Sequence, residues 1–140
     1  MFLDASAIAS MLLNEDDAPV LKERLNAAHG PYFVSPVAVM ETVMAVAKGQ
    51  KKNKNDPVTP AMIQEAQSLI SKFLSRLSVK EIPIDRKIGH LAQEALLAYG
   101  KMVRHPAELN LGDCFAYACA KAYRVPLLYK GNDFSQTDLA

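Results

Sequence analysis

Four acidic residues stand where a carboxylate is costly to keep. Asp4 follows an apolar run at the start of the chain, and Asp133 follows another at residues 125–129, across a Lys-Gly-Asn turn. Glu41 lies in residues 37–47, a segment apolar on every face of a helix, which leaves the carboxylate no polar side toward which to turn. Asp113 begins a segment of small, mostly apolar residues. Something must offset the cost of these charges, and a divalent cation is the simplest candidate.

The size of the repulsion decides what such a cluster needs if the four acids converge. Two carboxylates about 5 Å apart in an effective dielectric of about 20 repel by roughly 3 kcal/mol, and four acids make several such pairs. Without a cation, some of them would have to take up protons. A hard, oxygen-seeking ion such as Mg²⁺ or Mn²⁺ removes the repulsion and keeps some of its own waters. The four acids therefore predict metal-dependent phosphate chemistry.

Alternating strands and helices would position these acids. Helical periodicity and capping residues predict helices at residues 5–13, 16–28, 36–49, 60–77, 86–100 and 111–123. Short apolar or β-branched runs predict strands at residues 1–3, 32–34, 79–84 and 127–128. This alternation is typical of a buried parallel sheet flanked by helices. Ligands bind at the carboxyl ends of such strands. Asp4 and Asp133 both follow a strand, so we expect one composite site.

Local hydrogen bonding would explain three of these acids when each is taken alone. Asp4 stands at a helix start, where its side chain would serve as an N-cap. Asp113 lies three residues after Asn110, the spacing of a capping box. Asp133 follows Gly131 and Asn132 and fits simple turn chemistry.

Glu41 is the least easily explained by local structure. Glutamate is seldom fully buried unless it is paired, and the surrounding valines and methionines provide no partner. A structural ion pair with Lys121 or Arg104 is the alternative to a metal site.

Polar and basic residues near the acids are candidates for supporting roles. The Ser6 hydroxyl, at the helix start beside Asp4, would either assist a metal-bound water or satisfy the backbone. Asp138 would support the acids or cap the tail of the chain. The candidates for support around the acids are Ser6, Thr137 and Asp138. Basic residues usually form a solvated surface, but some would hold the phosphates of a polyanion here. These candidates are Lys51, Lys52 and Lys54 in the polar loop at residues 50–57, and Arg104.

Composition favours an ordinary globular chain. Its 140 residues are 50% hydrophobic and 22% charged, with a formal net charge of +1, so we expect one domain spanning residues 1–140. No run is long enough to cross a bilayer, and the first residues carry no secretory signal, so we expect a cytoplasmic protein. The two cysteines and three histidines lack metal-ligand spacing, which gives histidine-based sites little support.

Several short motifs, in this order and spacing, resemble the PIN-domain ribonucleases, specifically the VapC toxins of type II toxin–antitoxin pairs. The resemblance spans essentially the whole chain. The motifs are Phe2-Leu3-Asp4-Ala5-Ser6-Ala7, the single Glu41 on its apolar helix, Gly112-Asp113-Cys114-Phe115-Ala116-Tyr117-Ala118, and Gly131-Asn132-Asp133-Phe134 with Thr137-Asp138.

The resemblance implies a fold and an activity. The fold would be a three-layer α/β/α sandwich with a central, mostly parallel sheet. The activity would be that of an endoribonuclease dependent on Mg²⁺ or Mn²⁺, with Asp4, Glu41, Asp113 and Asp133 holding the metal directly or through water. The resemblance also implies an RNA substrate, a cognate VapB-like antitoxin that blocks the site, and a toxin homodimer.

Two other functions stay open at the level of sequence. The first is a catalytically silent domain of the same fold that binds RNA or protein, which the four intact acids argue against. The second is a phosphoacceptor or phosphatase, in which the acid after the first strand acts as a nucleophile. That design usually requires a second acid very close by, and Asp4-Ala5-Ser6 does not supply one.

Overall fold

The computed structural model describes residues 1–140 as an alternation of short strands and longer helices. The strands are β1 (Phe2–Leu3), β2 (Phe33–Val34), β3 (Lys80–Glu81) and β4 (Leu127–Leu128). The helices are α1 (Ala5–Leu13), α2 (Ala18–Ala27), α3 (Pro36–Gly49), α4 (Pro60–Arg76), α5 (Arg86–Tyr99) and α6 (Leu111–Tyr123). Two 3₁₀ turns are η1 (Lys101–Val103) and η2 (Asp133–Gln136).

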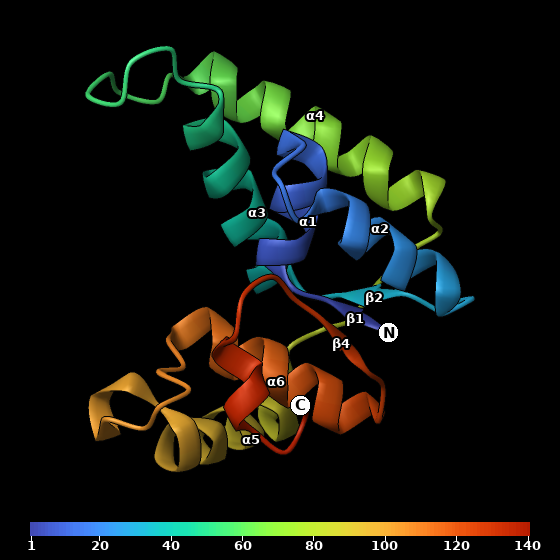
Figure 1. Cartoon of the computed structure of the whole chain (residues 1–140), viewed down its shortest axis with the longest axis vertical. Helices are drawn as coiled ribbons and strands as arrows, with labels where there is room; N and C mark the ends of the chain where they lie inside the picture. The colour runs from blue at the N-terminus through green and yellow to red at the C-terminus, as the bar shows by residue number, and fades with distance from the viewer.

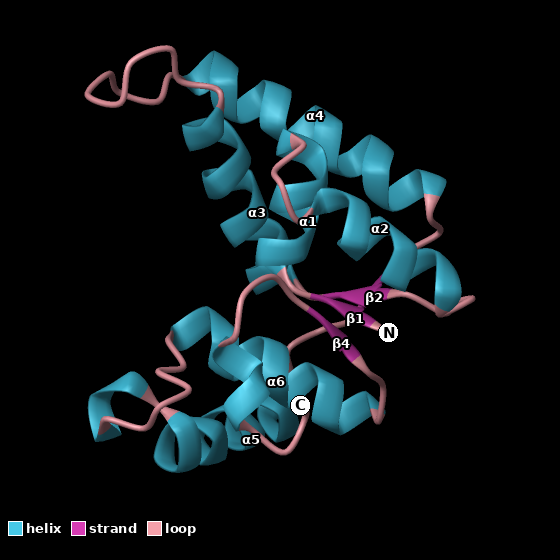
Figure 2. Ribbon diagram, viewed as in Figure 1, coloured by secondary structure: helices cyan, strands magenta, loops and turns pink.

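The strands form one parallel sheet in the order β3-β2-β1-β4. Figure 1 shows α1 to α4 on one side of the sheet and α5 and α6 on the other. Figure 2 shows that the sheet is small beside the helices that cover it. The predicted α/β fold, with helix layers on both faces of a parallel sheet, is confirmed.

Local sequence explains where most helices begin. The side chains of Ser35, Thr59 and Asp85 each accept a hydrogen bond from a first-turn N–H group, as N-caps do. Pro36 and Pro60 follow two of these caps at the first helical position, where the missing N–H is not needed. These starts agree with the predicted helices.

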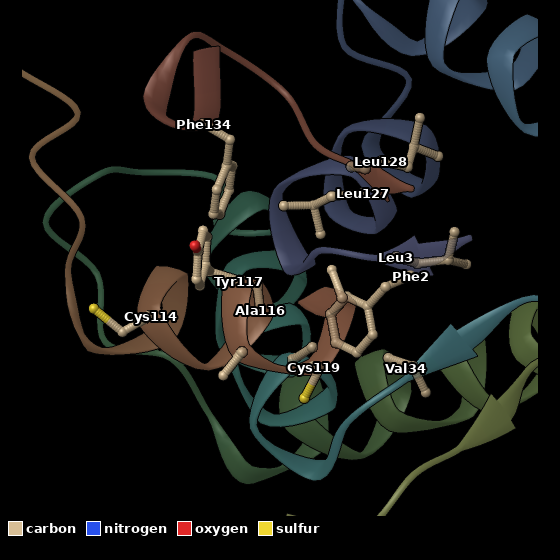
Figure 3. Packing of buried hydrophobic residues seen from close by; sticks show 14 of the residues in the cluster. Phe2, Leu3, Val34, Cys114, Ala116, Tyr117, Cys119, Leu127, Leu128 and Phe134 are labelled. Atoms are coloured by element: carbon tan, nitrogen blue, oxygen red, sulfur yellow. The ribbon is translucent and has the colours of Figure 1, made fainter. Parts of the chain in front are cut away.

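The core lies between the sheet and both helix layers. Its largest buried side chains include several from the strands and one from the segment after β4: Phe2, Leu3 and Leu128 are fully buried, and Phe134 is 1% exposed. Small buried residues of α6, such as Ala116 and Cys119, face this layer (Figure 3). They let α6 approach the sheet closely and bring its first turn to the edge where the strands end.

Two elements differ from the prediction by more than one residue at an end. The strand expected at residues 79–84 is reduced to Lys80–Glu81, because β3 is an edge strand that pairs only with the two residues of β2. The second helix begins at Ala18, two residues later than expected.

Helix α3 is also less enclosed than we expected from its apolar sequence. Met40 is 60% exposed and Met44 is 45% exposed, because one face of α3 lies open beside α4. Helix α3 therefore carries apolar residues on every face, but one of these faces is exposed. No helix of the protein is both long enough and apolar enough to cross a membrane.

Candidate active site

Asp4 lies at the carboxyl end of β1, a strand that pairs with both β2 and β4. Its backbone N–H donates to the carbonyl of Leu128 at 2.9 Å, which fixes it beside the end of β4. The residue is 5% exposed. An acid of this kind is costly to ionise, and burial raises the pKa of Asp4, although hydrogen bonds from Ser6 act in the opposite direction.

Ser6 connects Asp4 to the chain beyond β4. The Ser6 backbone N–H and hydroxyl both donate to Oδ2 of Asp4, at 3.0 and 2.5 Å. The Ser6 hydroxyl also accepts a hydrogen bond from the backbone N–H of Lys130 at 3.0 Å. Both bonds to Asp4 use the same carboxylate oxygen, so the local cap leaves Oδ1 available to the site.

Asp113 stands in the first turn of α6 and completes the capping box expected from sequence. Its Oδ2 accepts from the backbone N–H of Asn110 at 2.9 Å, while its own N–H donates to Oδ1 of Asn110 at 3.0 Å. As with Asp4, the cap occupies one carboxylate oxygen. The capping role and a role in a shared acid site are therefore compatible.

Glu41 reaches the same place from α3. A Cβ added at Gly112 would overlap both carboxylate oxygens of Glu41, so this carboxylate occupies the space that a side chain at position 112 would take. Gly112 directly precedes Asp113, which brings the acids of α3 and α6 together. The alternative of an ion pair with Lys121 or Arg104 is wrong, because none of the ion pairs in the protein includes Glu41.

The charges of the acids affect one another's ionisation, as the pKa values of three of them show. Burial raises the pKa of Glu41 to about 7, and the charges of Asp4 and Asp113 add to this effect. Burial also raises the pKa of Asp113 to about 6, with further contributions from Asp4 and Asp133. Asp133, which is exposed at the start of η2, likewise raises the pKa of Asp4. Four segments that lie far apart in sequence thus bring their carboxylates into one electrostatic cluster.

No basic side chain neutralises this cluster. The ion pairs of the protein join Lys121 to Asp138 and Lys130 to Glu15 and Asp17, all outside the four acids. At the same time, no group of three or more acidic, histidine or cysteine side chains stands close enough together to hold a metal ion without rearrangement. The arrangement is an open group of hard oxygen donors.

The three residues predicted to support the acids, Ser6, Thr137 and Asp138, make different contacts. Ser6 contacts Asp4 directly. Thr137 is buried, and its hydroxyl donates to the carbonyl of Phe134 at 2.8 Å, so it holds the turn that begins at Asp133. Asp138 accepts hydrogen bonds from Tyr117 and Lys121, which lower its pKa, with Lys121 contributing most.

Sequence reasoning did not identify the partners of Asp138. Tyr117 and Lys121 follow Asp113 at intervals of four residues, and this spacing was the available signal, because it puts all three on one face of α6.

The basic candidates lie away from the acids. Lys51, Lys52 and Lys54 are in the loop that projects beyond the far end of α3 (Figure 1). Glu41 lies eight residues before Gly49, the last residue of α3, which corresponds to about 12 Å of helix. Arg104 is exposed just after η1 and forms no ion pair.

Comparisons with known proteins place the chain in a family. The family model described as PIN domain matches residues 1–139. A VapC ribonuclease of Rhizobium meliloti is 44% identical over 144 residues, covering 99% of this chain and 98% of the relative. Ribonuclease VapC42 of Mycobacterium tuberculosis is 31% identical, with 99% and 96% covered. Ribonuclease VapC30 of the same organism is 32% identical, with 100% and 96% covered. With a sheet of PIN type and full-length relatives of this kind, the chain belongs to the PIN-domain family and is a VapC-type ribonuclease.

Proposed function

We propose that the chain is a Mg²⁺- or Mn²⁺-dependent endoribonuclease whose metal is held by Asp4, Glu41, Asp113 and Asp133, and that it is the toxin of a toxin–antitoxin pair. The observation that carries this proposal is the convergence of four carboxylates with no basic partner, in which neighbouring acids help to raise the pKa of Asp4, Glu41 and Asp113. Unpaired acids at this density call for a cation.

The donor set fits a hydrated hard cation. All four side chains offer carboxylate oxygens, which Mg²⁺ and Mn²⁺ prefer. Mg²⁺ usually binds through one or two carboxylates and keeps several waters, so it does not need a closed shell of protein ligands. Asp4 and Asp113 are the best candidates for direct ligands, because hydrogen bonds fix each carboxylate and leave Oδ1 unused.

The protein groups would have different tasks in the reaction. When bound, the metal would supply Lewis acidity toward the scissile phosphate and lower the pKa of an attacking water. Asp4, held by Ser6, and Asp113, held by Asn110, would set the geometry at the strand ends. Glu41, from α3, and Asp133, from η2, would accept hydrogen bonds from the attacking water and orient it for in-line attack.

RNA is the proposed substrate, and the basic loop is a proposed contact for it. Lys51, Lys52 and Lys54 begin beyond the far end of α3, so they would bind phosphates away from the one that is cleaved. Arg104 would contact the RNA near the start of α6. The cytoplasm, where RNA is plentiful, is the compartment we propose for this activity.

A VapB-like antitoxin is the proposed inhibitor. An apolar groove of about 660 Å³ runs between α3 and α4, and its walls include Val39, Met40, Met44 and Ile63. Met40 adjoins Glu41 in the chain, so an antitoxin segment in this groove would lead toward the acids. Such grooves accept the apolar face of a partner helix. We also propose a homodimer, supported by exposed apolar side chains at Leu97 and Leu111.

The test is RNA cleavage by the purified protein with Mg²⁺ or Mn²⁺, with EDTA, and with the variant Asp4→Asn. Asparagine can still accept the Ser6 N–H and cap α1, so the fold should persist. Because metal-ion catalysis is worth several kcal/mol, we expect Asp4→Asn to lower the rate by about a hundredfold or more.

Cleavage that EDTA and Asp4→Asn leave unchanged would refute the metal site. RNA binding that is equal with and without divalent ions, and never followed by cleavage, would favour a silent binding domain instead. Glu94→Gln, which removes an exposed acid that forms no ion pair, is the matched control.

A further inference from the structure

Two side chains of α6 hold the end of the chain through one carboxylate. The Tyr117 hydroxyl donates to Oδ1 of Asp138 at 2.7 Å, and Nζ of Lys121 donates to Oδ2 at 2.6 Å. Each oxygen of Asp138 thus has its own donor on α6. We call Tyr117, Lys121 and Asp138 the tail clamp.

The tail clamp lies on the helix face that also carries Asp113. Asp113, Tyr117 and Lys121 are spaced by four residues, and side chains at this spacing project from the same side of a helix. One face of α6 therefore carries the site acid Asp113 in its first turn and, in its next two turns, the two side chains that bind Asp138.

The segment between the clamp and Asp133 is short and packed. Asp133 opens η2, and the next residue, Phe134, is 1% exposed and lies edge-on to Tyr129 with ring centroids 5.0 Å apart. Figure 3 shows Phe134 pointing from η2 toward Tyr117 of α6. Thr137, directly before Asp138, is also buried and bonded to the carbonyl of Phe134. Four residues, of which Phe134 and Thr137 are buried, thus connect Asp138 to Asp133.

The other side of Asp133 is anchored at Lys130, whose backbone N–H donates to the Ser6 hydroxyl at 3.0 Å and whose Nζ pairs with Glu15 at 2.8 Å. Between Lys130 and Asp133, Gly131 adopts a left-handed φ of 86°, and a Cβ added there would meet nothing within 4 Å. A glycine in this conformation restricts the chain little. The position of Asp133 thus depends both on the anchor at Lys130 and on the residues between Asp133 and the tail clamp.

We propose that Asp138 is a positioning residue: by binding Tyr117 and Lys121 it holds η2 against α6 and sets Asp133 at its distance from Asp113. This inference rests on the proposed function, since it matters only if Asp133 serves the metal site. An ion pair as exposed as Lys121–Asp138, with side chains 37% and 48% exposed, usually adds little stability. Its effect here is on geometry, and its removal should affect the site more than the fold.

The experiment compares Asp138→Ala, Tyr117→Phe, Lys121→Met and Lys121→Arg with the wild type and with Glu94→Gln as a control for removal of an exposed acid. Four quantities are measured: Mn²⁺ affinity by electron paramagnetic resonance, kcat and KM for RNA cleavage, amide hydrogen exchange at residues 133–139, and the melting temperature.

We expect Asp138→Ala to weaken Mn²⁺ binding by about tenfold, the usual effect of removing a group that orients a metal ligand. It should speed exchange at residues 133–139 and lower kcat with little change in KM. Tyr117→Phe and Lys121→Met should act in the same direction, and Lys121→Arg should restore the wild-type values. Adding Tyr117→Phe to Asp138→Ala should change nothing further, because either substitution opens the same clamp.

Wild-type Mn²⁺ affinity and kcat in Asp138→Ala would overturn the inference, as would defects in Lys121→Arg equal to those in Lys121→Met. A fall in melting temperature with no change in Mn²⁺ affinity or kcat would make the tail clamp purely structural and overturn it too. Failure of the proposed function has a different signature, because the wild type itself would then neither bind Mn²⁺ nor cut RNA.

Discussion

Gly112→Ala is the substitution that tests the contact between α3 and α6 most sharply. Gly112 is the second residue of α6 and has no left-handed φ, so alanine fits its backbone. The new Cβ, however, would lie less than 3.0 Å from Oε1, Oε2 and Cδ of Glu41, which is closer than Cβ atoms approach other heavy atoms in proteins. The carboxylate would therefore have to move by about 1 Å.

Stability and activity should respond differently to this change. Alanine is favoured over glycine in a helix by up to about 1 kcal/mol. Overpacking typically costs about 1–3 kcal/mol, but here the displaced atoms end a flexible side chain and can move cheaply. We therefore expect the free energy of unfolding to change by no more than about 1 kcal/mol. Misplacement of a reacting group by about 1 Å can lower a rate by about a hundredfold, so cleavage should fall by about that much.

Gly89→Ala is the matched control, because Gly89 lies inside α5 and a Cβ there would meet nothing within 4 Å. It should raise the free energy of unfolding by about 0.5–1 kcal/mol and leave cleavage unchanged. The assay is initial cleavage rate with Mn²⁺, alongside urea unfolding of each variant. If Gly112→Ala cleaves RNA as fast as Gly89→Ala, then Glu41 does not act from the position it occupies beside Gly112.

Three further predictions concern charge. The pKa of Glu41 rises from 4.5 to about 7 on folding, so the metal-free protein should lose stability as pH rises through this window. Glu41→Gln should then be more stable than the wild type at pH of about 8, by roughly 1 kcal/mol after allowing for solvent screening, and no more stable at pH of about 4; equal urea midpoints at both pH values would contradict this. Ser6→Ala, which removes the hydroxyl bond to Asp4 and leaves the bond from the backbone N–H, should reduce cleavage by about tenfold with the metal present, measured at saturating RNA. Replacing Lys51, Lys52 and Lys54 by alanine should lower the slope of log K against log salt by about 0.7 for each phosphate that is no longer bound, and an unchanged slope would remove the loop from the RNA path.

Local signals were sufficient to predict the helices. The caps at Ser35, Thr59, Asp85 and Asn110 each lie directly before the helix they begin, so a few residues contain the information. The strand at residues 79–84 was predicted too long because its length depends on its neighbour. β2 offers only two residues for pairing, and no local pattern in β3 records this.

The candidate site shows a different limit. From the sequence, a capping role and a site role were alternative interpretations of Asp4 and Asp113. In the structure, one carboxylate oxygen of each residue accepts the capping hydrogen bond, and the other is left for the site. The close approach of Glu41 to Gly112 joins two helices that are far apart in the chain. Only tertiary packing brings them together, so residue type and spacing could suggest the meeting but not its geometry.

The most direct measurement of the central claim is an anomalous difference map from crystals grown with Mn²⁺. We predict a peak at the carboxyl ends of β1 and β4, within direct or single-water reach of Asp4 and Asp113 and facing Glu41 and Asp133. Strong Mn²⁺ density elsewhere on the protein, with none at these acids in crystals of an enzyme that needs Mn²⁺ to cut RNA, would contradict it.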